Sequence, residues 1–192
     1  MINLNGLSIA ELAALICSSL KKEGLQATLS GGACAEIYSS NKYVTADLDF
    51  VVNYIWPGND KIIGTVMSAL GFEKNGRIFL NKSVAYSVEF PPGPLSIGEE
   101  HQIKPVELKL KTGNLLLLSP TDSVKDRLTG YFYGNDAQCL EQAVMVAQDN
   151  PVDLRELLRW SKNEGKLEEF RKIAGRLGPV RRKKRGRKPA VS

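Results

Sequence analysis

Two aspartates separated by one residue follow a pair of glycines in this sequence. Asp47 and Asp49 flank Leu48, and fourteen residues separate Asp47 from Gly32. The alternation in "DLDFVVN" predicts a strand at 47–53, on which both carboxylates point to the same face. Their Cα atoms would lie about 6–7 Å apart, so the two charges repel each other unless a cation lies between them. Mg²⁺ suits this position because it takes one or two carboxylates together with substrate phosphates.

The glycines indicate what the other half of such a site would bind. Gly31 and Gly32 follow a short predicted strand at 27–29 and precede a predicted helix at about 33–39. Glycines at a strand-to-helix turn let the backbone approach a phosphate, and the helix N-terminus offers free N–H groups. Ser30 adds a hydroxyl donor, so the residues predict a triphosphate cradle beside the metal. The alternative is an ordinary loop followed by a strand with a solvated, charged edge.

A third carboxylate is available on a nearby predicted strand. Glu89 lies in "AYSVEF", where Val88 and Phe90 would face the core and leave the carboxylate on the opposite face. Such an acid can deprotonate an attacking hydroxyl or complete a second metal site, in which two ions stabilise the attacking and leaving oxygens. Glu107 in "VELKLK" is the competing candidate. It lies on a lysine-rich hairpin, where a salt bridge explains it more simply, so Glu89 is preferred.

The segments "LSGG" and "TADLDFVV" resemble the signature of the nucleotidyltransferase fold, which is shared by polymerase beta, aminoglycoside nucleotidyltransferases and bacterial toxins. The branch that the chain most resembles contains the AbiEii-like and MenT-like toxins of toxin–antitoxin systems, although its spacer is slightly long. The resemblance implies transfer of a nucleotide from an NTP, with one or two Mg²⁺ ions. It also implies that Asp47, Asp49 and Glu89 are the metal ligands and catalytic residues.

Two further residues come from the resemblance alone. Those toxins carry a helix that reads Pro-x-Asp/Glu-x-x-x-x-Lys, and "SPTDSVKDRL" matches it loosely through Pro120, Asp122 and Lys125. Lys125 is therefore expected to bind the triphosphate and assist catalysis. "YFYGNDAQCLEQA" resembles the next motif, which implies that Asp136 also binds the nucleotide. Without the resemblance, Lys125 would be an exposed helix lysine and Asp136 a helix cap.

Periodicity predicts the elements that position these residues. Ser8 and Glu11 have capping-box spacing at the start of a first helix. Four helical segments of similar texture follow residue 119. The fold class is therefore α/β (α+β): a nucleotidyltransferase-like mixed sheet with flanking helices at 1–118, a helical unit at 119–178 and a disordered basic tail at 179–192. The remaining predicted elements are a helix at 60–72, strands at 77–81 and 85–90, a hairpin of 106–111 with 114–119, and helices at 119–134, 135–150, 152–165 and 166–178.

The positive charge of the chain is concentrated in this tail. Seven basic residues fall within 181–189, and removing them from the net charge of +5 leaves the other residues at about −2. Such a block can hold nucleic acid by releasing counterions from phosphates, or it can be merely a solvated terminus. The candidate nucleic-acid-binding residues are Arg181, Arg182, Lys183, Lys184, Arg185, Arg187 and Lys188.

Composition excludes several other classes. The 192 residues contain no apolar run of the ~20 residues that span a bilayer and no signal-peptide pattern, so a cytoplasmic protein without a membrane partner is expected. The three cysteines lack paired spacing, which argues against a disulfide framework and a zinc site. A Ser-His or Cys-His hydrolase is disfavoured because His101, in a loop, would have to be its base.

The resemblance implies an RNA acceptor, such as a tRNA 3′ end, or a protein side chain, and the basic tail favours RNA. A toxin would also have an antitoxin partner. Three alternatives remain: a small-molecule enzyme of the aminoglycoside type, a non-catalytic nucleotide-binding relative, and a nucleic-acid-binding protein that acts through its tail. The intact aspartate pair argues against the non-catalytic relative.

Overall fold

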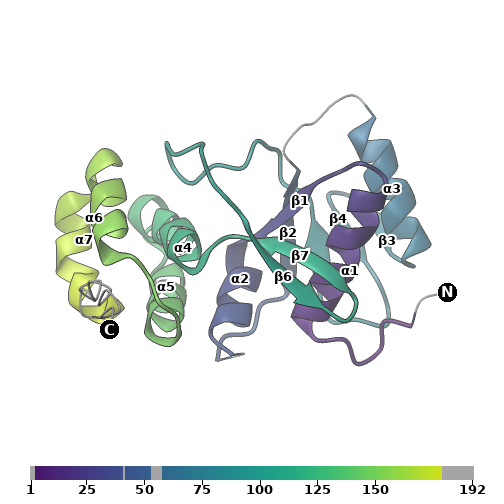
Figure 1. The fold of residues 1–192 in the computed structure, drawn as a ribbon, viewed down its shortest axis with the longest axis horizontal. Coiled ribbons are helices and arrows are strands. Elements are labelled where there is room, and N and C mark those ends of the chain that lie inside the picture. Colours follow the sequence, from purple (N-terminus) through teal and green to yellow (C-terminus); the bar gives the residue numbers. More distant parts are fainter. Residues whose placement is uncertain (1–2, 41, 53–57, 179–192) are drawn as a thin grey trace, which may run out of the picture.

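The computed structural model describes residues 3–40, 42–52 and 58–178, and in these residues seven strands form one mixed sheet (Figure 1). The strand order is β3-β4-β5-β2-β1-β7-β6. At its centre, β2 runs antiparallel to β1 and parallel to β5. The predicted mixed α/β sheet is therefore confirmed. The strands are β1 (Ala27–Ser30), β2 (Asp47–Val52), β3 (Glu73–Asn75), β4 (Ile78–Leu80), β5 (Ser87–Glu89), β6 (Val106–Leu110) and β7 (Gly113–Leu117).

Three helices accompany the sheet, and the later ones gather at one end of the molecule (Figure 1). The change from strands to helices falls between β7 and α4, close to the predicted boundary at residue 119. Both parts nevertheless contribute to one continuous hydrophobic core. The helices are α1 (Ile9–Lys22), α2 (Gly31–Tyr38), α3 (Asn59–Ala69), α4 (Pro120–Gly134), α5 (Ala137–Asp149), α6 (Leu154–Asn163) and α7 (Leu167–Ile173), followed by a 3-10 turn at Ala174–Leu177.

The helix starts follow from their capping residues. The Ser8 and Glu11 side chains form the predicted capping box at the start of α1. Ser119 caps α4, and a proline at the first helical position needs no donor there. Asp136 and Asp153 accept backbone N–H groups at the starts of α5 and α6. These contacts satisfy donors that a helix N-terminus otherwise leaves open.

The predicted elements differ from the observed ones in two places. Helix α2 begins at Gly31, not near residue 33, so the glycine pair forms its first turn. Strand β3 was not predicted, because Glu73–Asn75 is polar and exposed throughout and shows no alternation. The basic tail predicted at 179–192 lies outside the described residues.

No helix in the described residues is long and apolar enough to cross a membrane. The three cysteines, Cys17, Cys34 and Cys139, are buried free thiols. The buried residues of α1 pack over β1, β6 and β7, which fixes the sheet from one side.

Candidate functional site

Strand pairing brings three of the predicted site residues together. Asp47 and Asp49 begin β2, and the intervening Leu48 is fully buried on the other face. In the parallel pairing of β2 with β5, Asp49 is the register partner of Glu89. In the antiparallel pairing of β2 with β1, Asp49 is the partner of Ser30. The start of β2 therefore has the phosphate candidates on one side and the third carboxylate on the other.

Gly31 is required where the chain passes from β1 into α2. Its φ is +70°, a conformation that favours glycine. A Cβ at this position would lie 2.4 Å from Oδ2 of Asp49, so the Asp49 carboxylate packs directly against the helix N-terminus. The Ser30 hydroxyl donates to the backbone oxygen of Asp49 at 3.3 Å. A Cβ at Gly32 would lie 2.9 Å from Oγ1 of Thr45. The segment just before β2 therefore also packs closely against the first turn of α2.

The aspartate pair is electrostatically strained. Burial, followed by the nearby charges of Asp47 and Glu89, raises the pKa of Asp49 to about 6. Arg127 opposes this rise in the pKa of Asp49 but does not cancel it. The Ser87 hydroxyl donates a short hydrogen bond to Asp47 Oδ1. Uncompensated negative charge at one point of a fold is typical of a functional site and favours binding of a cation.

The two candidates for the third acid lie far apart in the sheet. Glu89 neighbours the aspartate pair and forms an ion pair with Arg77, Nη2 to Oε1 at 3.2 Å. Glu107 lies on edge strand β6, separated from β2 by β1 and β7, and it accepts a hydrogen bond from Asn114 at 3.0 Å. Of the two, only Glu89 adjoins Asp49, although its catalytic role stays a prediction.

Helix α4 contributes two residues that the sequence did not single out. Asp126 Oδ2 accepts the Gly31 N–H at 3.2 Å, at the point where the phosphate is expected. Arg127 donates to the same oxygen from Nη2 at 2.7 Å and from Nε at 3.0 Å, and its Nη1 donates to Gln142 at 3.2 Å. The motif itself contained the signal, because counting Pro-x-Asp-x-x-x-x-Lys from Pro120 reaches position 127, not 125.

In the structure, Lys125 pairs with carboxylates at the place where the sequence predicted a contact with phosphate. Its side chain is only 3% exposed, and its Nζ forms ion pairs with three carboxylates. Despite burial, these carboxylates raise its pKa. The structure thus gives Lys125 a role in holding α4, α6 and the loop before β6 together. The three ion-pair distances are 2.8 Å to Glu156, 2.9 Å to Glu100 and 3.2 Å to Asp122.

Asp136 serves as the cap of α5. It accepts the backbone N–H groups of Gln138 at 2.8 Å and Cys139 at 3.3 Å. Hydrogen bonds from the Cys139 thiol and from these backbone groups lower its pKa. This matches the simpler interpretation of Asp136, and its proposed contact with a nucleotide stays a prediction. The candidate nucleic-acid-binding residues of the tail lie outside the described residues.

The donor set at the start of β2 fits magnesium brought by a nucleotide. Within the described ranges, no group of three or more His, Cys, Asp or Glu side chains is arranged to hold a metal ion by itself. Mg²⁺ rarely needs one, because it completes its shell with waters and substrate phosphates. The raised pKa of Asp49 reflects a charge that such an ion would neutralise. The residues that would hold it are Asp47 and Asp49, with Glu89 beside them.

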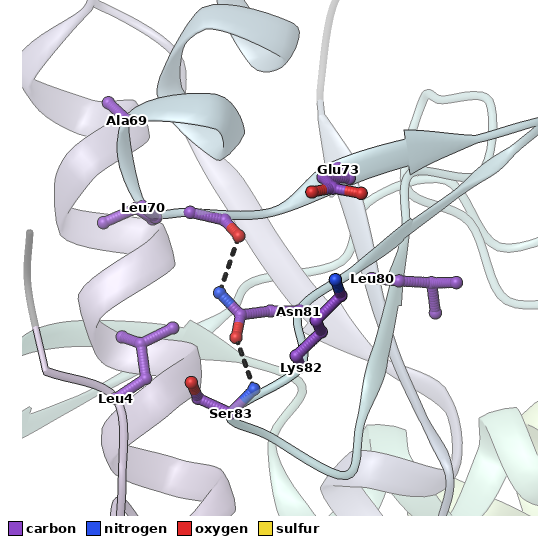
Figure 2. Close-up of a pocket in the computed structure, with 9 residues that line it drawn as sticks. Leu4, Ala69, Leu70, Glu73, Leu80, Asn81, Lys82 and Ser83 are labelled. Carbon is purple, nitrogen blue, oxygen red and sulfur yellow. Dashed lines mark hydrogen bonds between the residues drawn. The ribbon is translucent and has the colours of Figure 1, made fainter.

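A large pocket lies away from these residues. It has a volume of about 480 Å³, and Figure 2 shows it between the end of α3 and the segment that follows β4. Asn81 spans this segment by donating to the Gly71 carbonyl at 2.7 Å and accepting the Ser83 N–H at 2.7 Å. Neither the aspartate pair nor Gly31 lines it.

Comparison with solved structures agrees with this architecture. No protein-family model matches the chain, and no curated protein sequence matches it. An antigenic nucleotidyltransferase-like protein from Paracoccidioides brasiliensis is similar over 91% of this chain and 94% of its own, with a TM-score of 0.63 and 12% identity. The antibiotic-resistance factor ANT(2'')-Ia is similar over 88% and 94%, with a TM-score of 0.51 and 14% identity. The chain has the nucleotidyltransferase fold.

Proposed function

We propose that the protein is a Mg²⁺-dependent nucleotidyltransferase that transfers NMP from an NTP to a hydroxyl of an acceptor. One observation carries the proposal: the Asp49 carboxylate packs against Gly31 at the N-terminus of α2 and pairs in register with Glu89. Donors for a phosphate and ligands for a metal therefore meet at one point. The fold neighbours support this assignment. One is a nucleotidyltransferase-like protein and the other is the antibiotic-resistance factor ANT(2'')-Ia, and both share the fold of this chain.

In this mechanism the backbone N–H groups at Gly31 and Gly32 bind the phosphates, with the Ser30 hydroxyl beside them. The Gly31 N–H then exchanges its hydrogen bond to Asp126 for one to a phosphate. A bound magnesium ion supplies charge neutralisation for the phosphates and the leaving group. Glu89 accepts the proton of the acceptor hydroxyl. The acceptor oxygen forms a bond with the α-phosphorus as the bond from that phosphorus to the leaving oxygen breaks, and pyrophosphate departs.

We also propose Arg127 as the cation that binds the triphosphate. The sequence assigned this role to Lys125, but the Nζ of Lys125 is surrounded by carboxylates. Asp126 Oδ2 accepts hydrogen bonds from both Arg127 and the Gly31 N–H, so the guanidinium lies near the expected phosphate position. A guanidinium can exchange a carboxylate for a phosphate, to which it can donate two hydrogen bonds. Removing Arg127 is expected to weaken NTP binding about tenfold or more, since a hydrogen bond to a charged group contributes roughly 1.5–3 kcal/mol.

The acceptor is proposed to be RNA or a protein side chain, and a role as the toxin of a toxin–antitoxin pair follows from the resemblance in sequence. A small-molecule acceptor is the second candidate, because ANT(2'')-Ia is an antibiotic-resistance factor. A polycationic acceptor of that kind requires a site rich in carboxylates.

The decisive experiment incubates the protein with Mg²⁺ and each α-labelled NTP in turn, in the presence of total RNA and lysate protein. Asp47→Asn serves as the inactive control. Label on RNA that is lost with the variant and with EDTA supports an RNA nucleotidyltransferase and identifies the nucleotide. Label on a protein band keeps the chemistry and changes the acceptor. No label on RNA or protein with any NTP contradicts a macromolecular acceptor and favours a small-molecule enzyme or a binding protein.

A further inference from the structure

The start of β2, which carries Asp47, is held by a neighbouring strand on one side only. In the pairing of β1 with β2, Ser30 at the end of β1 lies opposite Asp49, so no residue of strand β1 lies opposite Asp47. On the other side, Asp47 pairs with Ser87 of β5, whose hydroxyl donates to its carboxylate. The position of this proposed metal ligand therefore depends on contacts outside the strand pairing.

A buried acid on α2 supplies such a contact. Glu36 is only 3% exposed, and its Oε2 accepts the backbone N–H of Thr45 at 2.6 Å. Thr45 lies two residues before Asp47, and its Oγ1 accepts the Asp47 N–H at 3.4 Å. Gly32 lies one turn before Glu36 on the same face of α2, where it lets Thr45 approach closely. Two positions of α2 thus hold the chain just before Asp47.

The same carboxylate also holds the chain that enters β5. The Tyr86 hydroxyl donates to Glu36 Oε1 at 3.2 Å, and Tyr86 directly precedes Ser87. The Ser87 N–H in turn donates to the Ala46 carbonyl at 2.8 Å, just before β2. Because β2 and β5 are parallel, both strands start at the same edge of the sheet. Glu36 therefore ties both strand starts to the helix whose first turn is the proposed phosphate cradle.

The stability of the core alone does not explain an acid at this position. A buried carboxylate costs stability unless it is paired and hydrogen-bonded. In the described part of the chain, the hydrogen-bond partners of Glu36 are a backbone N–H and a phenol, neither of which carries a positive charge. Residues that break such a rule of folding are typical of functional sites. The contacts of Glu36 therefore serve the geometry of the strand starts more than the stability of the core.

We propose that Glu36 is a positioning residue, which fixes the Asp47 carboxylate relative to the phosphate cradle. The inference rests on the proposed function and adds to it a residue that touches neither the metal nor the NTP. Without the contact to Thr45, the segment before β2 would move and the affinity for Mg²⁺ would fall. Asp49 would keep its place, because β1 and Gly31 hold it. Loss of Glu36 is therefore expected to weaken metal binding without abolishing it.

The first comparison is between Glu36→Leu, Glu36→Gln and the wild-type protein. Leucine removes both acceptor oxygens and keeps a similar volume. Glutamine can keep both contacts, because its amide oxygen can accept the Thr45 N–H while its amide nitrogen donates to the Tyr86 oxygen. Glu36→Gln is therefore the conservative variant that should restore the wild-type behaviour.

A second pair of variants keeps the test valid if Glu36→Leu does not fold. Tyr86→Phe removes one hydrogen bond to Glu36. Tyr38→Phe is its matched control, because it also removes a phenol hydroxyl that bonds across α2, in this case to the Leu118 carbonyl at 2.7 Å. Leu118 follows β7, so this bond does not reach the start of β2.

Three quantities are measured for each protein. Binding of Mn²⁺, a paramagnetic substitute for Mg²⁺, is followed by electron paramagnetic resonance of the free ion. The Mg²⁺ concentration that gives half-maximal labelling is taken from the assay with α-labelled NTP. Urea denaturation without metal gives the stability of each variant, so that a loss of fold can be told from a loss of metal affinity. If Mn²⁺ binds only together with NTP, the Mg²⁺ dependence decides alone.

We expect Glu36→Leu to weaken Mn²⁺ binding and to raise the half-maximal Mg²⁺ concentration about tenfold or more, with excess Mg²⁺ restoring labelling. Tyr86→Phe should shift both about fivefold, since it removes one hydrogen bond. Glu36→Gln and Tyr38→Phe should stay within about twofold of wild type. Unchanged metal affinity in Glu36→Leu and Tyr86→Phe, or an equal loss in Tyr38→Phe, overturns this inference but leaves the proposed function. A wild-type protein with neither Mn²⁺ binding nor Mg²⁺-dependent NTP turnover overturns both.

Discussion

At the scale of single residues, the site contains repulsion that its ligands would relieve. Asp49 is partly buried among other carboxylates, and its pKa is raised to about 6, chiefly by burial and by Asp47. The folded protein therefore binds a proton on Asp49 more readily than the unfolded chain does. By linkage, this carboxylate destabilises the fold increasingly as the pH rises from about 4 to about 6, and fully above that.

Asp49→Asn is accordingly expected to stabilise the protein while abolishing transfer. The gain in the free energy of unfolding should be about 1–2 kcal/mol at pH 7–8, after allowance for partial exposure, and should disappear below about pH 4. Urea denaturation of both proteins between pH 4 and pH 8 measures it. A variant that is equally stable at all pH values, or less stable at pH 8, would contradict the raised pKa. Adding Mg²⁺ should stabilise the wild-type protein more than the variant.

The substitution Gly31→Ala tests whether the phosphate cradle requires a glycine at this position. Gly31→Ala combines a φ of +70° with a Cβ 2.4 Å from the Asp49 carboxylate, so the backbone or the carboxylate must move. We expect a loss of about 1–3 kcal/mol in stability and at least a hundredfold loss of transfer, because displacement by about 1 Å can cost that much. Gly64→Ala is the control, since its Cβ would meet nothing within 4 Å on α3. That control should leave activity unchanged and stability equal or slightly raised.

At the scale of elements, local patterns were sufficient where the chemistry is local. The capping box of α1 and the hairpin of β6 with β7 were predicted from a few adjacent residues each. The aspartate pair was predicted because a strand period of two puts both carboxylates on one face. Strand β3 was missed, since its polar residues carry no periodicity and it forms only through its pairing with β4.

The same reasoning explains why Asp126 and Arg127 of α4 were not predicted. Asp126 meets Gly31 across 95 residues of sequence, a contact that no local pattern contains. Residues two apart on a helix are about 200° apart around its axis, so Lys125 and Arg127 face different neighbours. Matching the motif to position 125 or to position 127 therefore selects opposite faces of the helix. Placing the residues that close a site from another part of the chain required the folded structure.

Lys125→Met distinguishes the two faces. It removes the cation from three carboxylates while keeping the apolar volume, and we expect a loss of about 3–5 kcal/mol in stability. At a temperature where circular dichroism shows the variant folded, its KM for NTP should stay within about threefold of wild type. Arg127→Met, measured alongside, should raise that KM about tenfold or more. The opposite ranking of the two KM values would restore the role that the sequence assigned to Lys125.

At the scale of the whole molecule, the charge of the chain is divided between its parts. The seven basic residues at 181–189 carry more positive charge than the entire net charge of +5, so residues 1–180 are slightly acidic. A slightly acidic body repels RNA at long range, so any binding of RNA by this chain would depend on the tail.

Deleting residues 181–192 separates a tail that binds RNA from a solvated terminus. If the tail binds, the affinity for single-stranded RNA should fall steeply at 50 mM salt, and the dependence of log K on log salt should flatten by about 0.7 for each phosphate that the tail neutralises. Release of NMP from the NTP by water should not change, because the cradle and the aspartate pair lie outside the deleted segment. An unchanged salt dependence after truncation would show that the tail is a solvated terminus and that the body alone recognises the acceptor.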